Sequence, residues 1–166
     1  AKPVEYSIPK RTFSRPAHSP HTLYTPTLAM RQDLIATLQA LSAQQTTPTA
    51  EWDKSQALAR SAACDKVFLD LEPAQTPALL QEPSLLNAPL KGLAFSVKDL
   101  FDVAGSPTLA GSTVLQGAAV AQASCPAVAR LNQAGGAFLG RTNMVEFAFS
   151  GVGTNPHHGT PDAWDG

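Results

Sequence analysis

Charged residues are scarce in this sequence. They make up 15% of its 166 residues, and the formal net charge is -1. Proteins that bind nucleic acid or an anionic membrane usually carry a strong positive balance, because phosphate groups dominate the attraction. The composition therefore gives no electrostatic reason to expect nucleic acid or a membrane as a partner. With 43% hydrophobic residues, the length is typical of one soluble domain that can bury a core.

Cysteines and long apolar runs are also few. No run approaches the length that spans a bilayer, and the first residues lack the apolar core of a secretory signal. The two cysteines, Cys64 and Cys125, form neither a C-x-x-C pair nor a zinc-binding pattern. We expect two small buried thiols and, from them, a reducing, cytoplasmic compartment. Because the chain does not begin with Met, prior cleavage of a secretory signal stays an alternative.

Prolines are frequent in residues 1–27, at positions 3, 9, 16, 20 and 26. We expect an irregular or disordered N-terminal arm there. His18 and His21 lie in this arm, but the intervening Pro20 argues against a helix, and no carboxylate or thiol accompanies them. We therefore expect no metal site in the arm.

Two helices are predicted after the arm. Apolar residues keep helical spacing over 28–44, and Thr49 is a plausible N-cap for a second helix that ends near Cys64. Pro48 separates the two, so they should form a helical hairpin. The apolar set of the second helix includes Trp52, Leu58 and Ala62.

Three strands are predicted over residues 67–71, 93–97 and 137–140. The segment before the second strand, 72–89, has the composition of a linker with a turn or two of helix. The second strand is almost uncharged, which is typical of a strand buried on both faces. A helix over 126–134, with Val128 and Leu131 facing inward, lies between the second and third strands. This order predicts a crossover connection and parallel pairing.

Lys98 and Asp99 come directly after the second strand. A lysine at the end of a buried strand is costly unless it is paired or neutral, and a lysine with a lowered pKa can act as a base. From these residues alone, a Lys98–Asp99 ion pair is the favoured interpretation, because strand ends commonly carry charge.

The end of the sequence predicts a helix over 144–149 and then a loop rich in glycine, proline and asparagine. Such loops bring backbone close to a ligand. His157 and His158 are adjacent in this loop, so their side chains should point apart in an extended chain. Joint metal ligation by the two histidines is therefore not expected.

Four blocks of this sequence resemble the amidase signature family. KGLAFSVKD (91–99) is similar to that family's strand ending in VKD, and DVAG (102–105) with GS (111–112) continues the pattern. LGRTNMVEFA (139–148) and NPHHGTP (155–161) match two further blocks. The blocks occur in the family's order, whereas residues 1–90 match only loosely.

This resemblance implies an α/β fold with a mixed central sheet, flanking helices and the N-terminal helical hairpin. Residues 28–166 would be the N-terminal part of a single domain. The implied activity is hydrolysis of the C–N bond of a small-molecule amide by a Ser–cis-Ser–Lys triad, without metal or cofactor. Lys98 matches the catalytic lysine of the family. In the family, the two serines lie in a Gly/Ser-rich segment and just beyond it, which we expect after residue 166. The remainder of the amidase chain is therefore an expected partner, and this part alone should be inactive.

The resemblance also places Ala148, Phe149 and Ser150 beside the substrate. The alternative for Phe149, and for Phe147, is a core position in an amphipathic turn. Ser96 should share a face of the strand with Lys98, which does not make it the missing bridging serine.

Other residues of the blocks, Asp99, Asn143 and Glu146, we interpret as structural hydrogen-bonding groups. A homodimer is compatible with the resemblance. Two other functions stay open: the transamidation component of a tRNA-dependent amidotransferase, and a non-catalytic domain derived from the fold.

Overall fold

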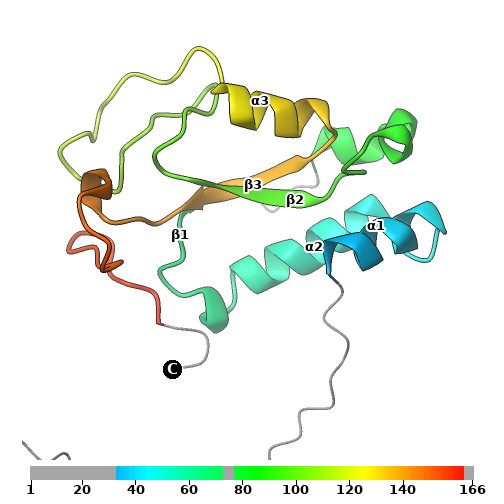
Figure 1. Cartoon of the computed structure of the whole chain (residues 1–166), viewed down its shortest axis with the longest axis horizontal. Helices are drawn as coiled ribbons and strands as arrows, with labels where there is room; N and C mark the ends of the chain where they lie inside the picture. Colours follow the sequence, from blue (N-terminus) through cyan, green and yellow to red (C-terminus); the bar gives the residue numbers. More distant parts are fainter. Residues whose placement is uncertain (1–32, 73–76, 163–166) are drawn as a thin grey trace, which may run out of the picture. The chain divides into compact units, whose positions relative to one another are not determined.

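A three-stranded mixed sheet is the centre of the fold (Figure 1). The computed structural model describes residues 33–72 and 77–162. Strand β3 (Ala137–Thr142) lies between β1 (Phe68–Leu71) and β2 (Ala94–Lys98). It pairs antiparallel with β1 and parallel with β2. The mixed sheet and the parallel crossover predicted from the sequence are confirmed, whereas the predicted arm lies outside the described residues.

The two predicted helices are present as α1 (Leu34–Ser42) and α2 (Pro48–Ala59). Thr47, not Thr49, caps α2: its hydroxyl accepts a hydrogen bond from the amide of Ala50 at 3.1 Å. Pro48 is therefore the first residue of α2 rather than a separator, a position that suits proline because the first amides of a helix have no intrahelical partner. The helix also ends earlier than expected, and a separate 3₁₀ turn, η1 (Ala62–Cys64), follows it.

Two apolar clusters cover the two faces of the sheet. α1 and α2 lie on one side, and α3 (Pro126–Gln133) lies on the other (Figure 1). On the α2 side the buried cluster is Trp52, Ala59, Leu80, Leu85, Ala137 and Leu139. On the α3 side it is Val97, Val103 and Val128. Within the described ranges, no helix is long and apolar enough to cross a bilayer.

The linker between β1 and β2 contributes to the first cluster. It forms two 3₁₀ turns, η2 (Ala78–Gln81) and η3 (Pro83–Asn87), which confirms the predicted short helical turns. Their residues Leu80 and Leu85 are buried. By contrast, Leu58 and Ala62, expected to face inward, are exposed. Leu131 of α3, also expected to face inward, is 37% exposed.

Strand β2 is not buried on both faces, as the sequence had predicted. Val97 is buried, but Ser96 and Lys98 on the opposite face are exposed. β2 is an edge strand of the described sheet, and its residue Ala94 packs against the cluster that contains Trp52 and Ala59 of α2. The uncharged strand β2 therefore has one buried face and one solvent-exposed face.

Residues 144–149 do not form the predicted helix. Only a 3₁₀ turn is present, η4 (Glu146–Ala148), and Phe147 and Ala148 have φ angles of 51° and 55°. This left-handed region is unfavourable for residues with a side chain and stops helix propagation. Phe147 and Phe149 are 50% and 93% exposed, so neither is the core residue that the alternative interpretation required.

Candidate active site

The carboxyl ends of β2 and β3 meet at the same edge of the sheet, because the two strands are parallel. All four sequence blocks are joined there by hydrogen bonds. The amide of Asp99 donates to the carbonyl of Thr142 at 3.1 Å. The side chain of Asn155 donates to the carbonyls of Gly111 and Met144 at 2.8 and 2.7 Å. This edge is the candidate active site.

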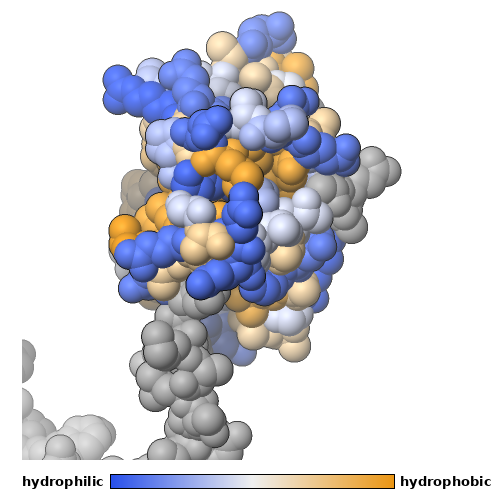
Figure 2. Space-filling model, turned by 90° about the vertical axis from the view of Figure 1, so that its right-hand side faces the viewer, coloured by the Kyte–Doolittle hydropathy of each residue, from blue (hydrophilic) through white to orange (hydrophobic). Residues whose placement is uncertain are grey.

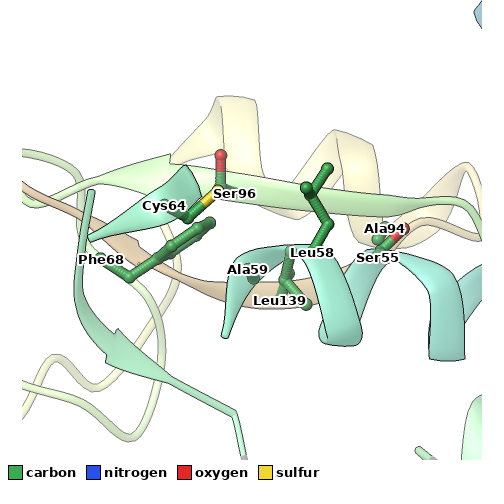
Figure 3. A pocket seen from close by; sticks show the side chains of 8 residues that line it. All are labelled: Ser55, Leu58, Ala59, Cys64, Phe68, Ala94, Ser96 and Leu139. Atoms are coloured by element: carbon green, nitrogen blue, oxygen red, sulfur yellow. The ribbon is translucent and has the colours of Figure 1, made fainter. Parts of the chain in front are cut away.

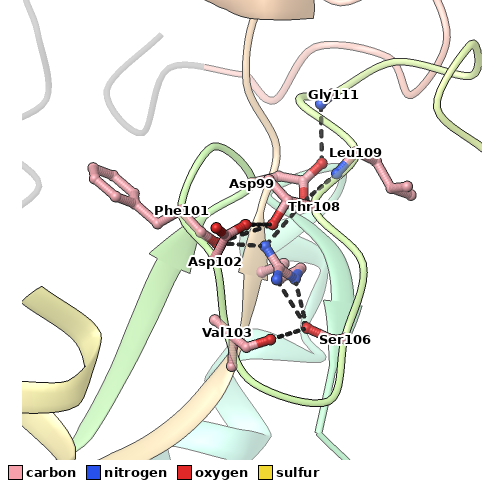
Figure 4. Close-up of polar contacts among 9 residues, drawn as sticks. Asp99, Phe101, Asp102, Val103, Ser106, Thr108, Leu109 and Gly111 are labelled. Atoms are coloured by element: carbon pink, nitrogen blue, oxygen red, sulfur yellow. Dashed lines mark hydrogen bonds and ion pairs between the residues drawn. The ribbon is translucent and has the colours of Figure 1, made fainter. Parts of the chain in front are cut away.

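Asp99 is the centre of one buried polar network (Figure 4). It is 1% exposed, and its carboxylate accepts from the amides of Gly111 and Leu109 at 2.9 and 3.4 Å. Arg141 of β3 donates from Nη1 to Asp99 Oδ1 at 3.2 Å. The predicted Lys98–Asp99 pair is therefore wrong, whereas the structural role expected for Asp99 is confirmed.

Arg141 extends this network into the loop after β2. Its Nη1 donates to the carbonyl of Phe101 at 3.0 Å, and its Nη2 donates to Ser106 Oγ at 2.8 Å. Ser106 Oγ in turn donates to the carbonyl of Val103 at 3.3 Å (Figure 4). A buried guanidinium that is bonded on several sides is tolerated because its charge is paired. The result is a fixed path for the loop that follows Lys98.

Asn155 and Asn143 fix the last block. Asn155 is 4% exposed, and its Oδ1 accepts from the amides of His157 and His158 at 2.8 and 3.0 Å. Asn143 Nδ2 donates to the carbonyls of Lys66 and Gly159 at 3.0 and 2.9 Å, which confirms its predicted structural role.

Glu146 joins three separate segments. Ser112 Oγ donates to Glu146 Oε1 at 2.5 Å, and His157 Nε2 lies 3.0 Å from the same oxygen. The hydrogen bond from Ser112, and secondarily the contact with His157, lower the pKa of Glu146. The carboxylate therefore stays ionised at neutral pH. We call Ser112, Glu146 and His157 the Glu146 bracket.

Lys98 lies at the end of β2, on the face that also carries Ser96. Its side chain is exposed, which differs from the buried setting expected for a catalytic lysine. No hydrogen bond or ion pair joins its ammonium to another residue of the ranges 33–72 and 77–162. Lys98 is thus next to the network of Asp99 and Arg141 but takes no part in it.

Ala148, Phe149 and Ser150 lie on and just after the left-handed turn η4, and all three are exposed. The hydrogen bond from the amide of Phe147 to the carbonyl of Ala110, at 2.9 Å, ties this turn to the loop after β2. The three residues therefore belong to the same edge of the sheet as Lys98. A direct contact with a substrate stays a prediction.

A small cavity lies beside Ser96 (Figure 3). Its volume is about 220 Å³, and its lining residues are Ser55, Leu58, Ala59, Cys64, Phe68, Ala94, Ser96 and Leu139. It lies between α2, η1 and the sheet, and none of Ala148 to Ser150 lines it. Cys64 is a free, half-buried thiol there, as is Cys125 near α3. Both thiols are less buried than expected.

A family profile described as Amidase matches residues 40–165. This chain belongs to the amidase family. A 2-amino-5-chloromuconic acid deaminase of Comamonas testosteroni is 43% identical over 110 residues, which are 66% of this chain and 21% of that protein. Amidase 1 of rice is 42% identical over 84 residues, 50% of this chain and 19% of its own length. The amidase chain described here thus spans about a fifth of these curated relatives.

Solved structures agree with this assignment. A vestigial protein complex bearing on the origins of an s-triazine catabolic enzyme has a TM-score of 0.71 and 26% identity, over 78% of this amidase chain and 30% of that chain. Among the curated protein sequences, a glutamyl-tRNA(Gln) amidotransferase component of Akkermansia muciniphila is also similar: it is 35% identical over 83 residues, 48% of this chain and 17% of its own length.

Arg141, Ser112 and Asn155 are the site residues whose roles sequence reasoning missed. An arginine within a run of buried strand residues was a usable signal, because a buried guanidinium requires an anionic partner. An asparagine before proline in a glycine-rich loop was another, because such side chains commonly bond to nearby backbone amides. Ser112 lies in the GS (111–112) part of a matched block, but nothing in the sequence indicated Glu146 as its partner.

Proposed function

We propose that the full-length protein hydrolyses the C–N bond of a small-molecule carboxamide and that Lys98 is its general base. The observation that carries the proposal is the position of Lys98 at the edge where all four blocks converge. Asp99, the nearest carboxylate in sequence, is occupied by Arg141 at 3.2 Å. Lys98 therefore does not serve as the counter-ion of Asp99.

The proposed reaction uses two serines that the remainder of the chain would supply. Neutral Lys98 takes the proton of the bridging serine, which takes the proton of the nucleophilic serine. The nucleophile forms a C–O bond to the amide carbonyl. The C–N bond breaks as the amine leaves with the proton that Lys98 returns through the bridging serine, which restores the neutral lysine. Water then hydrolyses the acyl-enzyme ester, releasing the acid and restoring both serines.

This chemistry requires a different environment for Lys98 than its exposed position here. Burial disfavours the charged form of a lysine and lowers its pKa, which lets it act as a base near neutral pH. We therefore propose that the remainder of the chain covers the Ser96 face of β2. This chain spans only about a fifth of the length of its curated relatives, which supports the proposal that further residues cover this face.

Ala148, Phe149 and Ser150 are the proposed substrate contacts. Their exposure at the same edge as Lys98 supports this role, because a substrate must reach both the base and its binding residues. We also propose a cytoplasmic location, with which the free thiols of Cys64 and Cys125 are compatible.

The alternative function is the transamidation role in a tRNA-dependent amidotransferase. The similarity to the Akkermansia muciniphila protein supports this alternative. A protein in that role would pass ammonia to an activated acyl group, whereas an amidohydrolase passes the acyl group to water.

The test measures release of amine or ammonia from a panel of simple carboxamides by the full-length protein and its Lys98→Ala variant. We expect wild-type turnover and a loss of about 10²–10⁴-fold in the variant, the usual range for general-base assistance. Hydrolysis that persists unchanged in Lys98→Ala would refute the assignment of the base. Activity seen only with glutaminyl donors and acylated tRNA would favour the amidotransferase.

A further inference from the structure

The turn η4 is held by polar contacts rather than by burial. Phe147 is 50% exposed and Phe149 is 93% exposed, so neither ring anchors the turn in a core. Phe147 and Ala148 have φ angles of 51° and 55°. Non-glycine residues persist in this region only when surrounding contacts fix them. Something other than hydrophobic packing must therefore hold η4.

The side chain of Glu146 supplies part of that restraint, in addition to the hydrogen bond from the amide of Phe147 to the carbonyl of Ala110. Ser112, which donates to its Oε1 at 2.5 Å, belongs to the loop after β2. His157, at 3.0 Å from the same oxygen, belongs to the loop after η4. A single carboxylate oxygen thus joins the turn to two segments that are distant in sequence. Ser112 is fixed in turn, because its Oγ also accepts from the amide of Val114 at 3.1 Å.

The Glu146 bracket does not have the arrangement of a serine–histidine–carboxylate triad. In such a triad the histidine accepts the serine proton, and the carboxylate orients the histidine from its other side. Here Ser112 donates directly to the carboxylate, and its residue is 0% exposed. A buried hydroxyl cannot reach a substrate carbonyl. The bracket therefore positions other groups and does not react itself.

We propose that Glu146 is a positioning residue for substrate binding. By holding Ser112 and His157 it fixes η4 in its left-handed conformation, so that Ala148 to Ser150 are presented to the amide substrate. This inference rests on the proposed function. Because Lys98 is on β2, outside the bracket, loss of Glu146 should weaken substrate binding and leave the chemical step nearly unchanged.

The experiment compares Glu146→Ala, Glu146→Gln and the exposed-residue control Glu82→Ala in the full-length protein, with kcat and KM for a simple carboxamide. For Glu146→Ala we expect KM to rise about tenfold or more and kcat to stay within about threefold, since a hydrogen bond to a charged group is lost. Glu146→Gln keeps an acceptor oxygen for Ser112, so its KM should stay within about threefold of wild type. Glu82→Ala should change neither constant.

An unchanged KM in Glu146→Ala, with or without a lower melting temperature, would overturn the proposal. If Glu146→Ala does not fold, His157→Ala removes one arm of the bracket and takes its place: KM should rise about threefold, and an unchanged KM overturns the proposal. Lys98→Ala in the same assay separates the two claims. Full activity there refutes the proposed base, whereas its loss together with an unchanged KM in Glu146→Ala refutes only the positioning role.

Discussion

Arg141 of β3 binds Asp99 at the end of β2, with Nη1 and Oδ1 3.2 Å apart and both side chains almost completely buried. The pair joins the two parallel strands at the edge where the candidate active site lies. It also separates the tasks of two neighbours in sequence: Asp99 holds the loop that follows β2, while Lys98 points to the opposite face. The Asp99 carboxylate, which the sequence suggested as the partner of Lys98, is thus paired with Arg141 instead.

The first prediction concerns this pair. Removing one partner leaves a buried charge without its counter-ion, so Arg141→Ala should lower the free energy of unfolding of the full-length protein by about 3–5 kcal/mol. Asp99→Asn should also destabilise it, and the double variant should lose less than the sum of the two. Urea denaturation of the four proteins measures the coupling. Additive losses would show that the pair contributes no coupling energy.

Gly111 offers a second prediction with a matched control. Its φ is +64°, and an added Cβ would lie 2.8 Å from the carbonyl oxygen of Met144. Gly117 has a φ of +93° and no atom within 4 Å of such a Cβ. Gly117→Ala should therefore show the conformational penalty alone, about 1 kcal/mol.

Gly111→Ala adds the steric clash and should lower the free energy of unfolding clearly more. The opposing atom is the backbone carbonyl oxygen of Met144, and displacing it would disturb the hydrogen bond that it accepts from Asn155. Thermal unfolding of the two variants gives the comparison. Equal melting temperatures of the two variants would contradict this, because they would mean that the loop around Gly111 moves to accommodate the methyl group without a loss of stability.

The sequence predicted the order of elements well and their burial less well. The parallel pairing of β2 and β3 followed from the strand–loop–helix–strand order, because crossovers of this kind have few alternatives. The open face of β2 was not visible in the pattern, since the small residues Ala94 and Ser96 fit either a core or a surface.

The candidate site shows the same division. The motif led to the proposal that Lys98 is the base, but the partner of Asp99 was not predicted, because Arg141 is 42 residues away and no periodicity connects them. The sequence predicted a helix over residues 144–149, where the structure has only the turn η4. Tertiary hydrogen bonds through Glu146 and Ala110 override that local preference.

A third prediction follows from the lowered pKa of Glu146. A carboxyl whose pKa is lower in the folded state stabilises the protein above its ordinary pKa of about 4.3, and this contribution is lost as the pH falls through the lowered folded value. The stability of wild type should therefore fall more steeply between pH 5 and pH 3, in this approximate window, than that of Glu146→Gln. Unfolding midpoints across this range test the sign, and parallel curves would contradict it.

The exposed apolar residues give a fourth prediction. Apolar side chains reach the surface among polar ones on the face shown in Figure 2, and Leu34, Ile35 and Leu58 are each more than half exposed. Residues 1–166 produced alone should therefore bind a hydrophobic dye or aggregate, because within residues 33–72 and 77–162 nothing covers the edge of strand β2 or these side chains. A monomer that melts cooperatively without binding dye would refute this.

The last prediction separates the two roles that a lysine at this position can have. Lys98→Arg keeps the positive charge, but arginine does not give up its proton in the physiological range and cannot act as a base. If Lys98 is the base, Lys98→Arg should be nearly as inactive in the full-length protein as Lys98→Ala, with a melting temperature close to wild type. If Lys98 served only through its charge, arginine would substitute for it and alanine would lower the stability. Amide hydrolysis and thermal unfolding of both variants decide between the roles. Activity of Lys98→Arg within about tenfold of wild type would rule out proton transfer by Lys98, because a tenfold change is only about 1.4 kcal/mol of the activation free energy.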